Sequence, residues 1–129
     1  MSIEIALGLN PKLLPYYLYH KKPIKEVNEI MFQRIIDVVS LHTGVDYEKM
    51  RSSSRKREIT ASRQLAMYLI DRLTSMSLVE IGKRFGGRDH STVINSKNVV
   101  KDVSSVDKQF NELLTGIIRE IEVRKKLNF

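Results

Sequence analysis

Cysteine is absent from this 129-residue chain, and so is tryptophan. Without cysteine the chain can form neither a disulfide nor a thiolate zinc site. The three histidines, His20, His42 and His90, lie too far apart in the sequence to suggest a metal-binding motif. We therefore expect no metal and no cofactor.

Long apolar runs are also absent. None approaches the roughly 20 residues of a transmembrane helix. Glu4 interrupts the apolar N-terminus and no basic segment precedes it, so we do not expect a signal peptide. The sequence contains no G-x-x-x-x-G-K-[S/T] motif, the loop that holds nucleotide phosphates. We therefore expect a cytoplasmic protein that uses neither a membrane nor ATP.

Basic residues are in excess. The chain has 22 Lys and Arg against 15 Asp and Glu, which gives a formal net charge of +7. This balance favours an acidic partner, either nucleic acid or an anionic membrane surface, although charge alone is also compatible with no such partner. The hydrophobic fraction of 42% allows one domain of this length to bury a core.

The first 23 residues differ from the rest of the chain. They contain all three prolines and a cluster of tyrosines, Tyr16, Tyr17 and Tyr19. Because proline interrupts helices, we expect a partly irregular N-terminal arm over residues 1–23 and a helical domain over residues 24–129. The arm either packs over the domain or docks a partner protein or a second copy of the chain.

The remaining chain shows helical periodicity, and no segment alternates like a strand, so we predict an all-α fold of five to six helices. One helix should run from Ile24 to a C-terminal cap at Gly44, and another should begin at an N-cap at Thr60. Residues 45–59 show weak periodicity, and the polar and basic run Ser52–Arg57 within them indicates a loop. The expected buried face of the first helix comprises Val27, Met31, Ile35, Val38 and Leu41.

A last helix should begin near Ser105. Its apolar stripe extends from Val106 to Ile121 and includes Phe110, Leu113 and Leu114. Such a stripe fits either the core of the domain or the seam of a coiled-coil-like dimer.

Between these helices the sequence predicts a helix-turn-helix over about residues 78–102. Ser77 and Glu80 form a capping box at the start of a short helix. Gly86-Gly87 suits its C-terminal end, because glycine adopts the left-handed conformation without a Cβ clash, and Asp89 suits the next N-cap. Many helical corners contain glycine and bind no ligand, so the turn alone is a moderate signal.

The second helix of such a motif enters the DNA major groove with its N-terminus first. Its first turn here carries Asp89, His90, Ser91 and Thr92. Asp can accept a hydrogen bond from cytosine N4, Ser and Thr can donate or accept, and a Thr methyl can touch a thymine methyl. Consecutive helical residues point about 100° apart and cannot converge on one substrate atom as a catalytic triad, so we predict no enzyme activity.

The segment Phe85–Val93, preceded by Ile81-Gly82, resembles the signature of the C-terminal DNA-binding domain (domain IV) of the bacterial chromosomal replication initiator DnaA. Upstream, Arg55–Ile59 and Ser62–Leu69 are similar to the family's basic loop and the helix that follows it. The resemblance covers about Ile24 to Val103. It implies a reader of short A/T-rich boxes of the TTATCCACA kind.

The resemblance also implies roles for individual residues. Asp89 to Thr92 would face bases and phosphates in the major groove, and Arg55 would enter the adjacent minor groove. Arg63 and Gln64 would hold the phosphate backbone. The full set of predicted DNA-binding side chains is Arg55, Lys56, Arg57, Arg63, Gln64, Arg88, Asp89, His90, Ser91, Thr92, Asn95 and Lys97.

Some of these assignments leave alternatives. Arg88 either bonds within the protein, in the turn or to an acidic side chain, or contacts a phosphate. Lys97 and its basic neighbours Lys83, Arg84 and Lys101 either face solvent or bind phosphate. Asp71 stands where some family members carry a basic residue, a change that would remove one backbone contact, and Asn95 and Ser96 replace a common His-Ala pair, which bears on the base preference.

We therefore predict a nucleoid protein that binds double-stranded DNA sequence-specifically at DnaA-box-like sites and regulates replication initiation or transcription. It would bind DNA as the DNA-binding domain of the full initiator does, but without the initiator's ATPase module. The alternative is a helical interaction module that binds a replication protein, or a second copy in a homodimer, through the arm and the last helix.

Overall fold

The computed structural model describes residues 24–127, which form helices and no strands. The prediction of an all-α fold with five to six helices is confirmed. The described part contains six helices: α3 (Ile24–Thr43), α4 (Tyr47–Arg51), α5 (Arg57–Leu73), α6 (Leu78–Arg84), α7 (His90–Val106) and α8 (Lys108–Leu127). The predicted N-terminal arm lies outside the described residues.

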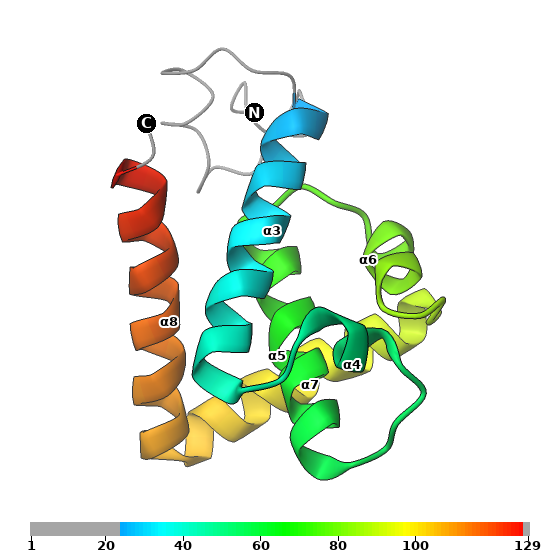
Figure 1. Cartoon of the computed structure of the whole chain (residues 1–129). Coiled ribbons are helices and arrows are strands. Elements are labelled where there is room, and N and C mark those ends of the chain that lie inside the picture. The colour runs from blue at the N-terminus through cyan, green and yellow to red at the C-terminus, as the bar shows by residue number, and fades with distance from the viewer. Residues whose placement is uncertain (1–23, 128–129) are drawn as a thin grey trace, which may run out of the picture.

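Helix α5 is the centre of the fold. It packs against α3, α4, α6 and α7, while α8 packs against α3 and α7 (Figure 1). The core includes Val27 and Ile35 of α3, Leu69 of α5 and Phe85 after α6, all fully buried. In Figure 1 α8 lies on one side of the molecule, and α6 with the start of α7 lies on the other. Helix α7 buries Val93, Ser96 and Val100, while His90, Ser91 and Thr92 of its first turn remain at the surface.

The weakly periodic segment over residues 45–59 contains the short helix α4 as well as the predicted loop. Asp46 caps α4 by accepting a hydrogen bond from the Lys49 amide at 2.8 Å, and Met50 is buried. Thr60 is not an N-cap, because its amide already donates to the Lys56 carbonyl at 2.9 Å inside α5. Arg57 consequently begins α5, and the loop shortens to residues 52–56.

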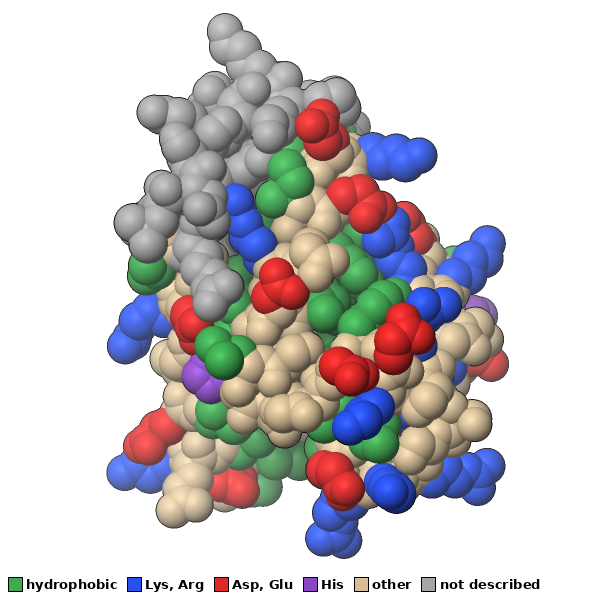
Figure 2. Space-filling model, in the orientation of Figure 1, with side chains coloured by type: hydrophobic (Ala, Val, Ile, Leu, Met, Phe, Trp, Pro, Cys, Tyr) green, Lys and Arg blue, Asp and Glu red, His purple; other side chains and the backbone are tan. Residues whose placement is uncertain are grey.

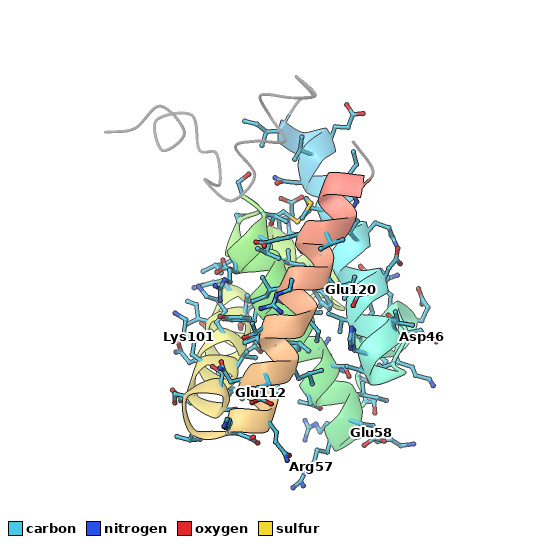
Figure 3. The ribbon with its side chains drawn as sticks, turned by 90° about the vertical axis from the view of Figure 1, so that its left-hand side faces the viewer. Asp46, Arg57, Glu58, Lys101, Glu112 and Glu120 are labelled. Carbon is cyan, nitrogen blue, oxygen red and sulfur yellow. The ribbon has the colours of Figure 1, made fainter. Side chains whose placement is uncertain are left out.

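At the C-terminal end of α3 the sequence pattern predicted the cap correctly but not the burial of Leu41. Gly44 has φ 74° and its amide donates to the Ser40 carbonyl at 2.8 Å, which confirms the predicted cap. Leu41, expected on the buried face, is exposed. The neighbouring His42 ring nitrogen lies 2.6 Å from the Glu120 carboxylate of α8, which joins the two helices near that end. Figure 3 shows Glu120 on the side of α8 that faces α3.

The junction of α7 and α8 falls later than Ser105. Helix α7 continues to Val106, and Asp107 caps α8 by accepting a hydrogen bond from the Phe110 amide at 3.1 Å. Val106 is 86% exposed and Leu113 is 42% exposed, so neither belongs to the core as the stripe predicted. The buried residues of α8 are Leu114, Ile117 and Ile121.

None of the helices over residues 24–127 combines the length and the apolar character that crossing a bilayer requires.

The two faces of α8 give a direct test of this packing. Ile117 is fully buried, so Ile117→Ala should lower the free energy of unfolding by about 2–5 kcal/mol through lost burial and a cavity. Leu113→Ala, on the exposed face of the same helix, is the control and should cost under about 1 kcal/mol. Urea unfolding followed by circular dichroism measures both. Equal losses would contradict the placement of α8.

Candidate nucleic-acid interface

Helix α6 is capped at its start and leads through a glycine turn into α7. Ser77 begins α6 by accepting a hydrogen bond from the Glu80 amide at 3.1 Å, as predicted. The Glu80 carboxylate accepts a hydrogen bond from Arg84 at 3.2 Å instead of completing the capping box. Gly86 and Gly87 have φ of 82° and 78°, the left-handed conformation predicted for them.

The turn is also tightly packed against other backbone. A Cβ atom at Gly82 would overlap the Arg88 carbonyl, and one at Gly86 would overlap the Arg51 carbonyl. The Arg88 amide donates to the Gly82 carbonyl at 2.9 Å, which fixes the path into α7. The turn therefore depends on glycine for close approach as well as for conformation.

Asp89 caps α7, as predicted. Its Oδ1 accepts hydrogen bonds from the Thr92 amide at 2.9 Å and from the Thr92 hydroxyl at 3.1 Å. The Thr92 amide bond is the main reason that the pKa of Asp89 lies below its ordinary value of 3.8. The cap therefore stabilises the folded state above that value and weakens as the pH falls through the lowered pKa.

The first turn of α7 is open to solvent. His90, Ser91, Thr92 and Asn95 are all exposed. Among the described residues, no hydrogen bond uses the side chain of His90, Ser91 or Asn95. Their donors and acceptors are therefore available to an external ligand.

The loop over residues 52–56 lies beside this turn. Arg55, Lys56 and Arg57 are exposed, and no ion pair within residues 24–127 involves them. Figure 3 shows Arg57 at the free end of α5, directed away from the helices. The loop and the turn both line a cleft of about 440 Å³, whose lining residues are Arg51, Ser52, Ser53, Ser54, Arg55, Thr60, Arg63, Gly86 and Arg88.

This side of the molecule is rich in positive charge. The cleft between the loop and the turn is lined by four arginines and by no acidic residue. Figure 2 shows Lys and Arg side chains along the edge occupied by α6 and the start of α7. Such a surface attracts an anion.

Arg63, predicted to hold the phosphate backbone, is buried and bonded within the protein. It is only 5% exposed, and its guanidinium group donates to the Met50 carbonyl at 2.6 Å, the Ser52 carbonyl at 3.0 Å and the Ser54 carbonyl at 3.1 Å. Burial is the main reason that its pKa is lowered, followed by the charge of Arg88. Its described contacts support the loop from inside. Gln64, next to it, is half-buried and makes no side-chain hydrogen bond among the described residues.

Arg88 bonds within the protein, one of the two alternatives that the sequence left open. Its guanidinium group donates to the Phe85 carbonyl within the turn and to the Ser52 carbonyl at 2.9 Å. The second bond crosses to the basic loop. No carboxylate accepts from Arg88 within residues 24–127.

Lys97 is paired with an acidic residue. Its Nζ lies 2.9 Å from Asp71 Oδ2, which joins α7 to α5, and each side chain is about one quarter exposed. A second cleft of about 280 Å³ surrounds the pair and is lined by Tyr68, Asp71, Arg72, Lys97 and Lys101. The Asp71 carboxylate thus partly neutralises the charge of Lys97, next to the basic side chains of Arg72 and Lys101.

The support beneath the turn had no signal in the sequence. Tyr47 of α4 donates a hydrogen bond to the Arg84 carbonyl at 2.5 Å, and its ring packs edge-on against Phe32 and Phe85. Burial is the main cause of the raised pKa of Tyr47. Arg84 is paired with Glu29, which lowers the pKa of that carboxyl. These contacts join residues far apart in the sequence, so no local pattern could reveal them.

The described residues contain no group of three or more His, Asp or Glu side chains placed to hold a metal ion.

The fold and the site define a helix-turn-helix domain with a basic loop next to its turn. The family model described as bacterial dnaA protein helix-turn-helix matches residues 32–100, and the chain belongs to that family. The matched segment includes the loop, the turn and the first eleven residues of α7.

Several curated relatives are chromosomal replication initiator proteins DnaA. The protein from Synechococcus sp. is 39% identical over 101 residues, which is 78% of this chain and 22% of the relative. A protein from Thermus thermophilus is 45% identical over 80 residues, 62% of this chain and 18% of the relative. The Flavobacterium psychrophilum protein is 36% identical over 120 residues, 93% and 24% of the two chains. This chain spans about a fifth of their length.

The two turn glycines should differ in tolerance. Gly87→Ala introduces a strained left-handed residue in open space and should cost about 1–2 kcal/mol of unfolding free energy. Gly86→Ala carries the same strain and also forces a Cβ against the Arg51 carbonyl, so it should cost clearly more. Thermal and urea unfolding compare the two variants. A smaller loss for Gly86→Ala would contradict the packing of the turn against the loop.

Proposed function

We propose that this protein binds double-stranded DNA sequence-specifically, at sites of the DnaA-box kind, with α7 in the major groove. The observation that supports this most is the pairing of two exposed elements on one side of the molecule. The uncommitted side chains of His90 and Ser91 stand at the start of a capped helix, and the exposed Arg55 lies on the loop across the cleft. Family membership supports the same assignment.

The first turn of α7 suits the DNA major groove, and the loop that carries Arg55 suits the adjacent minor groove. The first turn of α7 offers His90, Ser91 and Thr92 to base edges, and Asn95 extends the same face by one turn. Arg55 suits a narrow A/T-rich minor groove, where the negative potential is strongest. Lys56, Arg57 and Gln64 are placed for the phosphate backbone, which sets position more than sequence preference.

We propose indirect roles for three of the predicted residues. Asp89 acts through its cap, since Oδ1 is used by Thr92, and a base contact would use the other oxygen. Arg63 and Arg88 act by holding backbone carbonyls. Their positive charge still adds to the attraction for DNA without a direct contact.

We propose a regulatory role in replication initiation or transcription in the cytoplasm, at the nucleoid. The chain would occupy boxes without ATP-driven action, because its sequence contains no P-loop motif. The alternative of a dimer seam along the last helix is less favoured. Leu114, Ile117 and Ile121, the buried residues of α8, already pack in the core.

A gel-shift comparison tests the proposal. The protein should bind a duplex with a TTATCCACA-type box more tightly than a scrambled duplex, by about 10³-fold or more at physiological salt. About five phosphate contacts predict a log–log salt slope near −4 to −5. Equal affinity for the two duplexes would overturn sequence-specific binding.

His90→Ala should lose base contacts without loss of fold. We expect a loss of about 1–3 kcal/mol for the box duplex and a weaker preference for it over scrambled DNA. Because His90 is exposed and makes no internal side-chain bond among the described residues, the melting temperature should stay within about 2 °C. Arg119→Ala, an exposed charge on α8, is the control and should leave the preference intact. An unchanged preference in His90→Ala would remove His90 from the base contacts.

The Asp71–Lys97 pair should restrain DNA affinity. Asp71→Asn frees the Lys97 ammonium and removes a negative charge beside other cations, so box and scrambled duplexes should both bind about three- to tenfold tighter. The salt slope should become more negative by about 0.9. Lys97→Ala should weaken both duplexes alike.

The double variant Asp71→Asn with Lys97→Ala separates the two causes. If the gain comes through Lys97, most of it should disappear in the double variant. An unchanged salt slope in Asp71→Asn would show that Lys97 does not reach a phosphate.

A further inference from the structure

The basic loop is attached to the helix-turn-helix by side-chain bonds to its carbonyls. Ser52 is the meeting point, because its carbonyl accepts from Arg63 at 3.0 Å and from Arg88 at 2.9 Å. Arg63 comes from α5 and Arg88 from the turn before α7. One carbonyl oxygen is therefore shared by two guanidinium groups from different elements.

Further contacts hold the same segment. Arg63 also donates to the carbonyls of Met50 and Ser54, on either side of Ser52. Arg88 also donates to the Phe85 carbonyl within the turn. The backbone of Gly86 meets the Arg51 carbonyl so closely that no Cβ fits between them. The loop and the turn thus share a side-chain bridge and a direct backbone contact.

We propose that Arg88 is a positioning residue that fixes the distance between the two DNA-reading elements, the Arg55 loop and the first turn of α7. It acts through the Ser52 carbonyl and touches no base. This inference rests on the proposed function, since it assigns the two elements to adjacent grooves. Without the bridge Arg55 keeps its charge and is no longer held in register with α7.

The chemistry of the bridge allows a sharp substitution. A guanidinium group is planar and donates to two carbonyls in fixed directions, whereas an ammonium group is a point charge on a flexible stem. A phosphate accepts either group, so Arg88→Lys would preserve a phosphate contact largely intact. The same change would break a fork between Phe85 and Ser52. Arg88→Lys therefore separates positioning from direct contact.

The first measurement is the preference for A/T over G·C pairs at the flank of the box that faces Arg55. Wild-type protein should prefer the A/T flank by about tenfold. Arg88→Lys should reduce this ratio to below about threefold, as Arg55→Ala does. The double variant should show little further loss, because both changes remove the same contact. Arg119→Lys on α8 is the matched control and should keep the full ratio.

The second measurement needs no DNA. The Ser54 amide donates to the Ser52 hydroxyl at 3.3 Å within the bridged segment. Its hydrogen exchange should become at least about tenfold faster in Arg88→Lys, while the buried core at Leu69 keeps its protection. If Leu69 also loses protection in Arg88→Lys, the measurement is repeated with Arg88→Gln. The planar amide of Gln can still donate to one of the two carbonyls, Phe85 or Ser52.

The outcomes separate the two proposals. Wild-type protein that binds box and scrambled duplexes equally would overturn the proposed function, while the exchange result would still test the bridge. Wild-type protein that selects the box, together with an Arg88→Lys variant that keeps both the flank preference and slow Ser54 exchange, would overturn the positioning role alone. Uniform weakening on both flanks in Arg88→Lys, with the flank preference kept, would show that Arg88 does not hold Arg55 in register and would also overturn it.

Discussion

The close approach of backbone to backbone around the helix-turn-helix is the constraint on which the rest of the site depends. Gly82 lies against the Arg88 carbonyl and Gly86 against the Arg51 carbonyl, and neither contact leaves room for a Cβ atom. The first contact sets the path from α6 into α7. The second places the basic loop next to that path. Both elements that we assign to DNA are therefore located by the same short turn.

The helices behind the turn keep it in place. Tyr47 and the aromatic rings around it connect α4 to the end of α6, and the Arg84–Glu29 pair connects α6 to α3. Helix α8 covers α3 and α7 on the far side from the site (Figure 1). Buried apolar area supplies most of the stability of this arrangement. The polar bonds mainly specify which surfaces meet, because an unmade bond at a buried group is costly.

The basic residues of the site fall into two groups, those exposed to solvent and those that hold backbone carbonyls. Arg55, Lys56 and Arg57 are exposed and unpaired among the described residues, whereas Arg63 and Arg88 are used to hold carbonyls. Carbonyls neutralise no charge, so the supporting arginines still contribute to the field at the surface. Lys97 differs because Asp71 offsets its charge. The positive charge that this surface presents thus depends on charge pairing as well as on the number of basic residues.

Local chemistry in the sequence determined the class of fold and the left-handed conformation of Gly86 and Gly87. It also determined the caps at Ser77 and Asp89 and the position of the first turn of α7. These features act over three or four residues, which is the range of helical periodicity and capping. The sequence predicts the N-cap of α5 four residues late, at Thr60, because Lys56 provides no side-chain cap for a pattern to detect. The sequence pattern also overestimates the burial of the apolar stripe from Val106 to Ile121. Periodicity identifies an apolar helix face, but it does not show how much of that face a neighbouring helix covers.

Only the tertiary structure decided which basic residues remain free. Arg55 and Arg63 lie only eight residues apart in the sequence, yet Arg55 is exposed and Arg63 is 5% exposed. The difference arises because Arg63 points back to the carbonyls of Met50, Ser52 and Ser54, which carry no side-chain signal. Arg88 meets the same Ser52 carbonyl from 36 residues away. The sequence by itself specified the motif that reads DNA in our proposal, and folding determined which arginines support it, because backbone carbonyls accept hydrogen bonds whatever residue they belong to.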